Sequence, residues 1–176
     1  MAQQRIAVVT GGMGGLGESI STKMADAGYK VVVTYSPGNK THGEWVQQMK
    51  ARGYDMLAVA CDVSREADIK RLAAQAEEKY GRVDVYFSNA GIVQRGGLEA
   101  SDADWDRNWR IHVMAHVWAA RAVVEKMVAR GGGYFLVTAS AAGLLNIVES
   151  ATYGVTKHGA VAFAEWLAIA YGRRGL

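Results

Sequence analysis

Tyr153 and Lys157 are spaced for acid–base chemistry. They lie four positions apart in a stretch whose pattern predicts a helix, so both side chains project from one helix face. A phenol is a poor acid or base at neutral pH, and a nearby ammonium favours its phenolate form. The pair therefore predicts proton transfer to or from a substrate oxygen. The alternative is an ordinary surface contact, because tyrosine and lysine often occur at this spacing by chance.

Ser140 extends this chemistry. It follows the apolar run Tyr134–Ala139, which predicts a strand. Ligands of open α/β sheets bind at the carboxyl ends of the strands. We therefore expect Ser140 to hold a substrate oxygen while Tyr153 gives or takes its proton.

A glycine-rich turn, TGGMGGLG at Thr10–Gly17, joins the first predicted strand to the first predicted helix. Gly11 permits a tight turn, Gly15 a close approach of backbone to a pyrophosphate, and Gly17 close packing of the helix. The N–H groups and the positive dipole end of the helix then face the phosphates. The alternative is a glycine-rich turn with no ligand. The residues expected to bind the dinucleotide here are Gly11, Met13, Gly14, Gly15, Leu16 and Gly17.

The end of the second predicted strand, Lys30–Tyr35, selects between cofactors. A carboxylate at this place binds the ribose hydroxyls of NAD and repels the extra phosphate of NADP. This chain has no acid there, and it has one cation and several hydrogen-bond donors. We predict that it prefers NADP(H), with NAD(H) as the alternative, and that the contacts come from Tyr35, Ser36, Asn39 and Lys40. The competing interpretation makes Lys40 a solvated loop lysine.

Strand and helix patterns alternate along the chain. The predicted strands are Arg5–Thr10, Lys30–Tyr35, Met56–Ala60, Val83–Ser88 and Tyr134–Ala139. The predicted helices are 15–27, Glu44–Arg52, Glu66–Tyr80, a long stretch from the capping box Ser101–Asp104 to Arg130, and Ala151–Gly172. Such alternation implies parallel pairing, and the continuous apolar runs indicate strands buried on both faces. We expect one domain over 1–176 with the α/β fold of a doubly wound parallel sheet.

Composition excludes several classes of protein. Glycine supplies 21 of 176 residues, without the proline or repeats of a fibrous or disordered chain. No apolar run reaches the roughly 18 residues of a membrane span, and the scattered basic residues argue against nucleic-acid binding. Cys61 is the only cysteine, which fits the cytoplasm. His42, His116 and His158 lack metal-ligand spacing, so we expect surface or packing roles and no metal.

Taken together, these motifs resemble the short-chain dehydrogenase/reductase family, whose fold is Rossmann-like. Thr10-Gly11-Gly15-Gly17 match the family's TGxxxGxG pattern, and Ser88-Asn89-Ala90-Gly91 correspond to its Asn-Asn-Ala-Gly pattern. Asp62 matches its acid after the third strand, Ser140 its serine, and Tyr153-Lys157 its YxxxK pattern. The first sixty residues most resemble the acetoacetyl-CoA reductases of that family. From about Asp84 onward the chain is more similar to other carbonyl reductases.

The resemblance implies hydride transfer between a nicotinamide and a small carbonyl or alcohol substrate, such as the 3-oxoacyl thioester acetoacetyl-CoA. Tyr153 would be the general acid in reduction, Lys157 would also bind the nicotinamide ribose, and Ser140 would orient the carbonyl. The other cofactor contacts it implies are Asp62, Val63, Asn89, Ala90 and Gly91.

One departure from the family pattern is His112, which stands where an asparagine usually supports a water relay to the lysine. An imidazole can also donate and accept, so we count His112 among the catalytic residues and expect an added titration near neutral pH. The alternative is a helix histidine with no proton role.

The second departure is the end at Leu176, before the family's last strands and its substrate-covering segment. We expect the sheet to lack those strands. The alternative function is therefore a catalytically impaired, truncated or engineered dinucleotide-binding module. A methyltransferase that uses S-adenosylmethionine shares a glycine loop, but it typically has an acid after the second strand and no YxxxK.

The predicted helices at 112–130 and 151–172 are apolar on more than one side. We expect a homodimer or homotetramer through them, as in the family. Burial by segments outside this sequence is the alternative.

Overall fold

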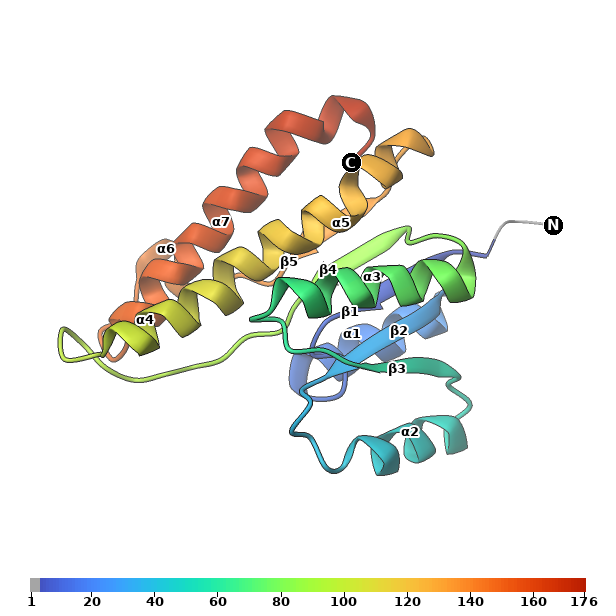
Figure 1. Ribbon diagram of the computed structural model, residues 1–176, viewed down its shortest axis with the longest axis horizontal. Helices are drawn as coiled ribbons and strands as arrows, with labels where there is room; N and C mark the ends of the chain where they lie inside the picture. Colours follow the sequence, from blue (N-terminus) through green and yellow to red (C-terminus); the bar gives the residue numbers. More distant parts are fainter. Residues whose placement is uncertain (1–3) are drawn as a thin grey trace.

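Five parallel strands form one sheet in the order β3-β2-β1-β4-β5 in the computed structural model, which describes residues 4–176 (Figure 1). The strands are β1 (Ile6–Val9), β2 (Lys30–Tyr35), β3 (Met56–Ala60), β4 (Val85–Ser88) and β5 (Tyr134–Val137). In register, Ala7 of β1 lies opposite Val31 of β2 and Val85 of β4. The predicted doubly wound sheet is confirmed, and its direction of winding reverses between β1 and β4.

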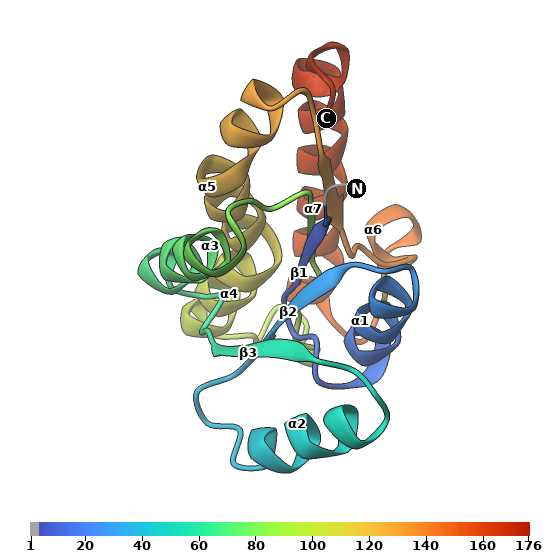
Figure 2. The same cartoon turned by 90° about the vertical axis from the view of Figure 1, so that its right-hand side faces the viewer.

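Helices cover both faces of this sheet (Figure 2). They are α1 (Gly15–Asp26), α2 (His42–Ala51), α3 (Glu66–Tyr80), α4 (Asp102–Trp109), α5 (Ala115–Ala129), α6 (Ala142–Leu145) and α7 (Ala151–Tyr171). A π-helical turn, η1 (Arg110–Met114), joins α4 to α5, and a 3₁₀ turn, η2 (Gly172–Arg174), follows α7.

Alternate residues of the central strands enter two cores. Val9, Val31 and Val33 pack on the side of α1 and α2, whereas Val8 and Val32 pack under α3 and α5. Burial on both faces explains why these strands are continuous apolar runs. The same expectation is wrong for β5, an edge strand of this sheet, because Tyr134 and Leu136 on one of its faces are exposed.

The turn between β1 and α1 requires two of its glycines. Gly11 has a φ of +62°, in the left-handed region that favours glycine. A Cβ added to Gly17 would overlap the carbonyl oxygen of Gly11 and come within 2.9 Å of the Asn89 amide nitrogen. Only glycine therefore lets α1 start this close to the ends of β1 and β4.

The long helix predicted as far as about Arg130 is confirmed, since helical structure continues without a gap from α4 through η1 to the end of α5 at Ala129. Its start is confirmed, because the Ser101 hydroxyl accepts the Asp104 N–H at 3.2 Å in a capping box. Within this helical stretch, residues 110–114 widen into the π turn η1. Single π turns of this kind concentrate at functional sites. This one turns the His112 ring into the interior, where it is fully buried.

Within residues 4–176 no helix combines the length and apolarity needed to cross a membrane. The same residues contain no group of three or more histidine, cysteine, aspartate or glutamate side chains placed to hold a metal ion.

Candidate active site

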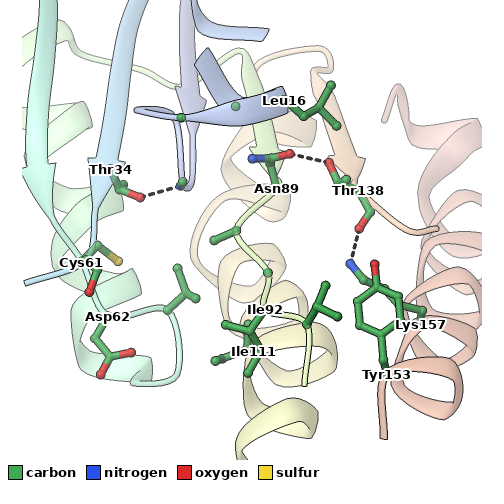
Figure 3. A pocket seen from close by; sticks show the side chains of 18 of the residues that line it. Leu16, Thr34, Cys61, Asp62, Asn89, Ile92, Ile111, Thr138, Tyr153 and Lys157 are labelled. Atoms are coloured by element: carbon green, nitrogen blue, oxygen red, sulfur yellow. Dashed lines mark hydrogen bonds between the residues drawn. The ribbon is translucent and has the colours of Figure 1, made fainter. Parts of the chain in front are cut away.

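A cleft of about 500 Å³ lies at the carboxyl ends of the strands (Figure 3). Such a cleft, beside the point where winding reverses, is where ligands bind in doubly wound sheets. The residues that we singled out from sequence and that line it are Gly11, Gly14, Leu16, Gly17, Ser36, Asp62, Val63, Asn89, Ala90, Gly91, Tyr153 and Lys157. Residues from distant parts of the chain therefore meet in one place.

A series of hydrogen bonds links the strand ends under this cleft. The Thr10 hydroxyl accepts the N–H groups of Asn89 at 2.9 Å and of Ala90 at 3.0 Å. The Thr138 hydroxyl donates to the Asn89 amide oxygen at 3.0 Å. The Lys157 ammonium donates to the Thr138 carbonyl at 2.8 Å. Side chains from β1, β4, β5 and α7 are thus held in one arrangement.

Tyr153 and Lys157 both face the cleft from the first turns of α7 (Figure 3). The helix begins at Ser150, whose hydroxyl accepts the Tyr153 N–H at 3.2 Å. The Lys157 Nζ lies 5.6 Å from the centre of the Tyr153 ring. Burial lowers the pKa of Lys157 to about 8, because a charged ammonium is poorly solvated there.

Ser140 lies beyond the end of β5, and its hydroxyl oxygen accepts the Ala142 N–H at 3.1 Å. It is not among the residues that line the cleft. Its role toward a substrate remains a prediction.

At the far end of the cleft, Asp62 is fixed by its neighbours. Its carboxylate accepts both the N–H and the hydroxyl of Ser64, at 3.0 and 2.7 Å. Its own N–H donates to the Asp68 carboxylate at 2.9 Å. This network keeps the turn after β3 in place beside Val63, which also lines the cleft.

The loop after β2 is held by contacts among its own residues. The Tyr35 ring stacks on His42 with centroids 4.2 Å apart, and Asn39 Oδ1 accepts the N–H and hydroxyl of Thr41. Lys40 is exposed. Of the four residues predicted to select the cofactor, only Ser36 lines the cleft.

Two loop residues also lie outside the lining of the cleft. The Met13 side chain packs against the core around Val9, Val31 and Val33. Gly15 has open space around it, with nothing within 4 Å of an added Cβ.

Eight residues that line the cleft were not singled out from sequence. They are Thr34, Cys61, Ile92, Val93, Arg107, Ile111, Thr138 and Ala139. Thr34, Cys61 and Thr138 lie at carboxyl ends of strands. Their positions at the ends of predicted strands are the sequence signal by which they could have been found. Thr34 accepts the Gly11 N–H at 2.9 Å, which fastens the glycine turn to β2. Burial raises the pKa of the Cys61 thiol to about 12, so it stays protonated.

His112 lies just below the cleft and is fully buried. Its Nε2 accepts the Ile92 N–H at 3.1 Å, and its Nδ1 lies 2.8 Å from the Thr156 hydroxyl. Burial, together with the Lys157 charge, lowers the pKa of His112 to about 4. The expected titration near neutral pH is therefore wrong, because charging this ring requires desolvation beside an ammonium.

His116, one helical turn further, is also buried, with its Nδ1 2.6 Å from the Ser88 hydroxyl. Burial and the charge of Lys157 lower the pKa of His116 to about 3. Two neutral imidazoles thus lie near the buried lysine.

The fold and the cleft agree with comparisons to known proteins. A family model described as short chain dehydrogenase matches residues 5–176. An uncharacterized NAD-dependent oxidoreductase of Mycobacterium tuberculosis is 32% identical over 98% of this chain and 68% of its own length. The acetoacetyl-CoA reductase of Cupriavidus necator is 30% identical over 98% of this chain and 71% of its own. The chain belongs to the short-chain dehydrogenase/reductase family, as its motifs predicted.

Solved structures give the same result. L-sorbose reductase from Gluconobacter frateurii, complexed with NADPH and L-sorbose, is 29% identical, with a TM-score of 0.90 over 98% of this chain and 66% of that one. A short-chain dehydrogenase/reductase from Burkholderia phymatum in complex with NAD is 30% identical, with a TM-score of 0.91 over 99% of this chain and 63% of that one. The chain spans about two thirds of the length of these proteins.

The two buried histidines predict acid sensitivity. In an unfolded chain they take up protons near their ordinary pKa of 6.5, whereas the folded protein keeps them neutral down to about 4 and about 3. The free energy of unfolding is therefore unaffected by them above pH 6.5 and falls as pH drops toward 4.

Urea unfolding of the wild type and of His116→Asn at pH 7 and pH 4.5 tests this loss of stability. The variant keeps a polar partner for Ser88 and removes the titration of the His116 ring. We expect the variant to lose less of its pH 7 stability than the wild type does between these two pH values. An equal or larger loss in the variant would contradict the assignment.

Proposed function

We propose that this chain, as a single NAD(P)-binding domain over 1–176, is an NADP(H)-preferring oxidoreductase of the cytoplasm. It transfers a hydride between the nicotinamide and a small carbonyl or alcohol substrate. The observation that carries the proposal is the single cleft that joins the glycine turn at one end to Tyr153 and Lys157 at the other.

The residues present fit a dinucleotide. No side chain caps the N-terminus of α1 at Gly14, and an added Cβ at Gly14 or Gly15 would meet nothing within 4 Å. Backbone N–H groups with open space before them suit a pyrophosphate. Asp62 and Val63 would hold the adenine end, and the backbone at 89–91 with Lys157 would hold the nicotinamide ribose. Met13, Leu16 and Gly17 would complete the contacts of the phosphate turn.

When bound, the nicotinamide supplies the hydride chemistry. Tyr153 gives a proton to the carbonyl oxygen in reduction and takes it back in oxidation. Lys157, held by the Thr138 carbonyl, favours the phenolate with its charge. Ser140 orients the carbonyl through its hydroxyl hydrogen. That hydrogen stays available, because it is the hydroxyl oxygen that accepts the Ala142 N–H.

The preference for NADP(H) rests on the end of β2. Ser36 lines the cleft there, Lys40 is exposed nearby, and the loop from Ser36 to Thr41 carries no carboxylate. Tyr35 and Asn39 would act by shaping this loop, through the stack on His42 and the turn at Thr41. The relatives include proteins described with NAD and with NADPH, so they favour neither cofactor. The proposed preference therefore rests on the loop of this chain.

The similarity to an acetoacetyl-CoA reductase favours a 3-oxoacyl thioester as the substrate. Exposed apolar side chains along α7, namely Val155, Trp166 and Ile169, favour a homodimer or homotetramer through α5 and α7.

A dinucleotide-binding module without turnover is the second candidate. It is favoured by the position of Ser140, whose hydroxyl is engaged by the Ala142 N–H outside the lining of the cleft.

Removing the Tyr153 hydroxyl separates the two candidates. In Tyr153→Phe we expect NADPH oxidation with acetoacetyl-CoA or simple ketones to fall at least about a hundredfold, because the proton donor is lost. The dissociation constant for NADPH, measured by fluorescence, should change less than about threefold. Unchanged turnover in the variant would refute the role of Tyr153. NADPH binding by the wild type without turnover across the panel would favour the second candidate.

The cofactor preference is tested by dissociation constants for NADPH and NADH. We expect NADPH to bind to the wild type more tightly than NADH does. We expect Lys40→Ala to raise the dissociation constant for NADPH about three- to fivefold, which is the size of one exposed charge contact. NADH binding should not change. Lys50→Ala, in the exposed part of α2, is the matched control and should leave both constants unchanged. Tighter binding of NADH to the wild type would contradict the preference.

A further inference from the structure

The His112 ring bridges two segments that border the cleft. One is the backbone after β4, where the Ile92 N–H donates to Nε2 at 3.1 Å. The other is α7, where Thr156 lies 2.8 Å from Nδ1. Tyr153 meets the ring edge-on with centroids 5.4 Å apart. The bridge therefore reaches both the expected cofactor-binding backbone and the catalytic face of α7.

The partners of the ring determine which nitrogen carries the proton. A backbone N–H can only donate, so Nε2 must be the unprotonated acceptor of the Ile92 N–H. The Thr156 hydroxyl lies 2.7 Å from the Thr152 carbonyl, an acceptor to which it must donate. Its oxygen is then left to accept, so Nδ1 of His112 donates to it. The Ile92 end leaves Nε2 unprotonated and the Thr156 end places the proton on Nδ1, so together they require the neutral Nδ1–H tautomer.

This arrangement is unsuited to a proton relay through the side chain. A relay must accept a proton at one nitrogen and release it from the other. A proton on Nε2 would point at the Ile92 N–H and replace a hydrogen bond by two opposed donors. The ring would have to give up its hydrogen bond with the Ile92 N–H before Nε2 could take up a proton.

The Lys157 ammonium approaches the same backbone. A Cβ added to Gly91 would lie 3.4 Å from His112 Nε2 and 3.6 Å from Lys157 Nζ. The titratable or charged groups that face the ring in the described structure are Tyr153 and Lys157 from α7 and His116 from α5. A neutral imidazole adds no positive charge beside the buried lysine.

We propose that His112 and Thr156 form a positioning bridge that fixes the distance between the backbone at Gly91–Ile92 and the Tyr153–Lys157 face, with His112 neutral and in its Nδ1–H tautomer. The catalytic consequence rests on the proposed function. The bridge itself is a statement about hydrogen bonds, so it can be tested without turnover.

Nitrogen-15 NMR of the imidazoles tests the bridge directly. His112 is assigned by the signals that disappear in His112→Asn. We expect a protonated Nδ1 and an unprotonated Nε2 throughout pH 5.5–8, and loss of the protected Nδ1–H signal in Thr156→Val. Thr156→Ser, which keeps the hydroxyl, should restore that signal. An Nε2–H tautomer, or a ring that titrates near neutral pH, would overturn the proposal.

Kinetics test the consequence for catalysis. In Thr156→Val we expect kcat to fall roughly tenfold, about the effect of one positioned hydrogen bond, with KM and the NADPH dissociation constant changed less than about twofold. Thr156→Ser should recover most of kcat, and His158→Asn, an exposed histidine of α7, should match the wild type. The pH profile of kcat should keep its shape in Thr156→Val.

Several results would count against the positioning role. The positioning role is overturned if Thr156→Val keeps the wild-type kcat while circular dichroism shows an intact fold. A pH profile changed in both Thr156→Val and His112→Asn supports a relay instead. If the wild type turns over no substrate, the proposed function fails, and the NMR experiment still decides the bridge.

Discussion

The structure depends on one interaction, the hydrogen bond between the buried Lys157 ammonium and the Thr138 carbonyl. A buried ammonium is costly unless it is paired, so the carbonyl must be held in place. Thr138 is fixed through its hydroxyl to Asn89, and Asn89 in turn binds the backbone and hydroxyl of Thr10. The position of Lys157 is therefore set by the ends of three parallel strands. The glycine turn begins at the same Thr10, so this turn and the Tyr153–Lys157 face share one support.

Near this support two buried histidines stay uncharged. His112 and His116 are neutral because burial and the lysine charge both oppose their protonation. The π turn η1 brings the His112 ring inward, and the ring then ties that turn to α7. The positive charge of Lys157 thus lies near two neutral rings. Such a setting suits the role that we propose for Lys157, which is to favour the phenolate of Tyr153.

Much of this arrangement follows from sequence, because strand ends and glycine turns have local causes. β2, β3 and α3 begin and end at the predicted residues, since the apolar runs of the two strands and the amphipathic pattern of the helix stop at clear turn signals. The π turn could not be predicted, because no local sequence signal marks it and the partners of His112 in it, Ile92 and Thr156, are distant in sequence. Arg107 and Ile111 were missed for the same reason, and the stacking of Tyr35 on His42 is a similar contact within a loop.

The central claim is that one cleft holds the dinucleotide with its nicotinamide end toward Tyr153 and Lys157. A crystal structure of the chain with NADPH tests it most directly. We predict the pyrophosphate at the N-terminus of α1, the adenine beside Asp62 and Val63, and the nicotinamide ribose in contact with Lys157. NADPH bound elsewhere, or with its nicotinamide end away from Tyr153, would contradict the account.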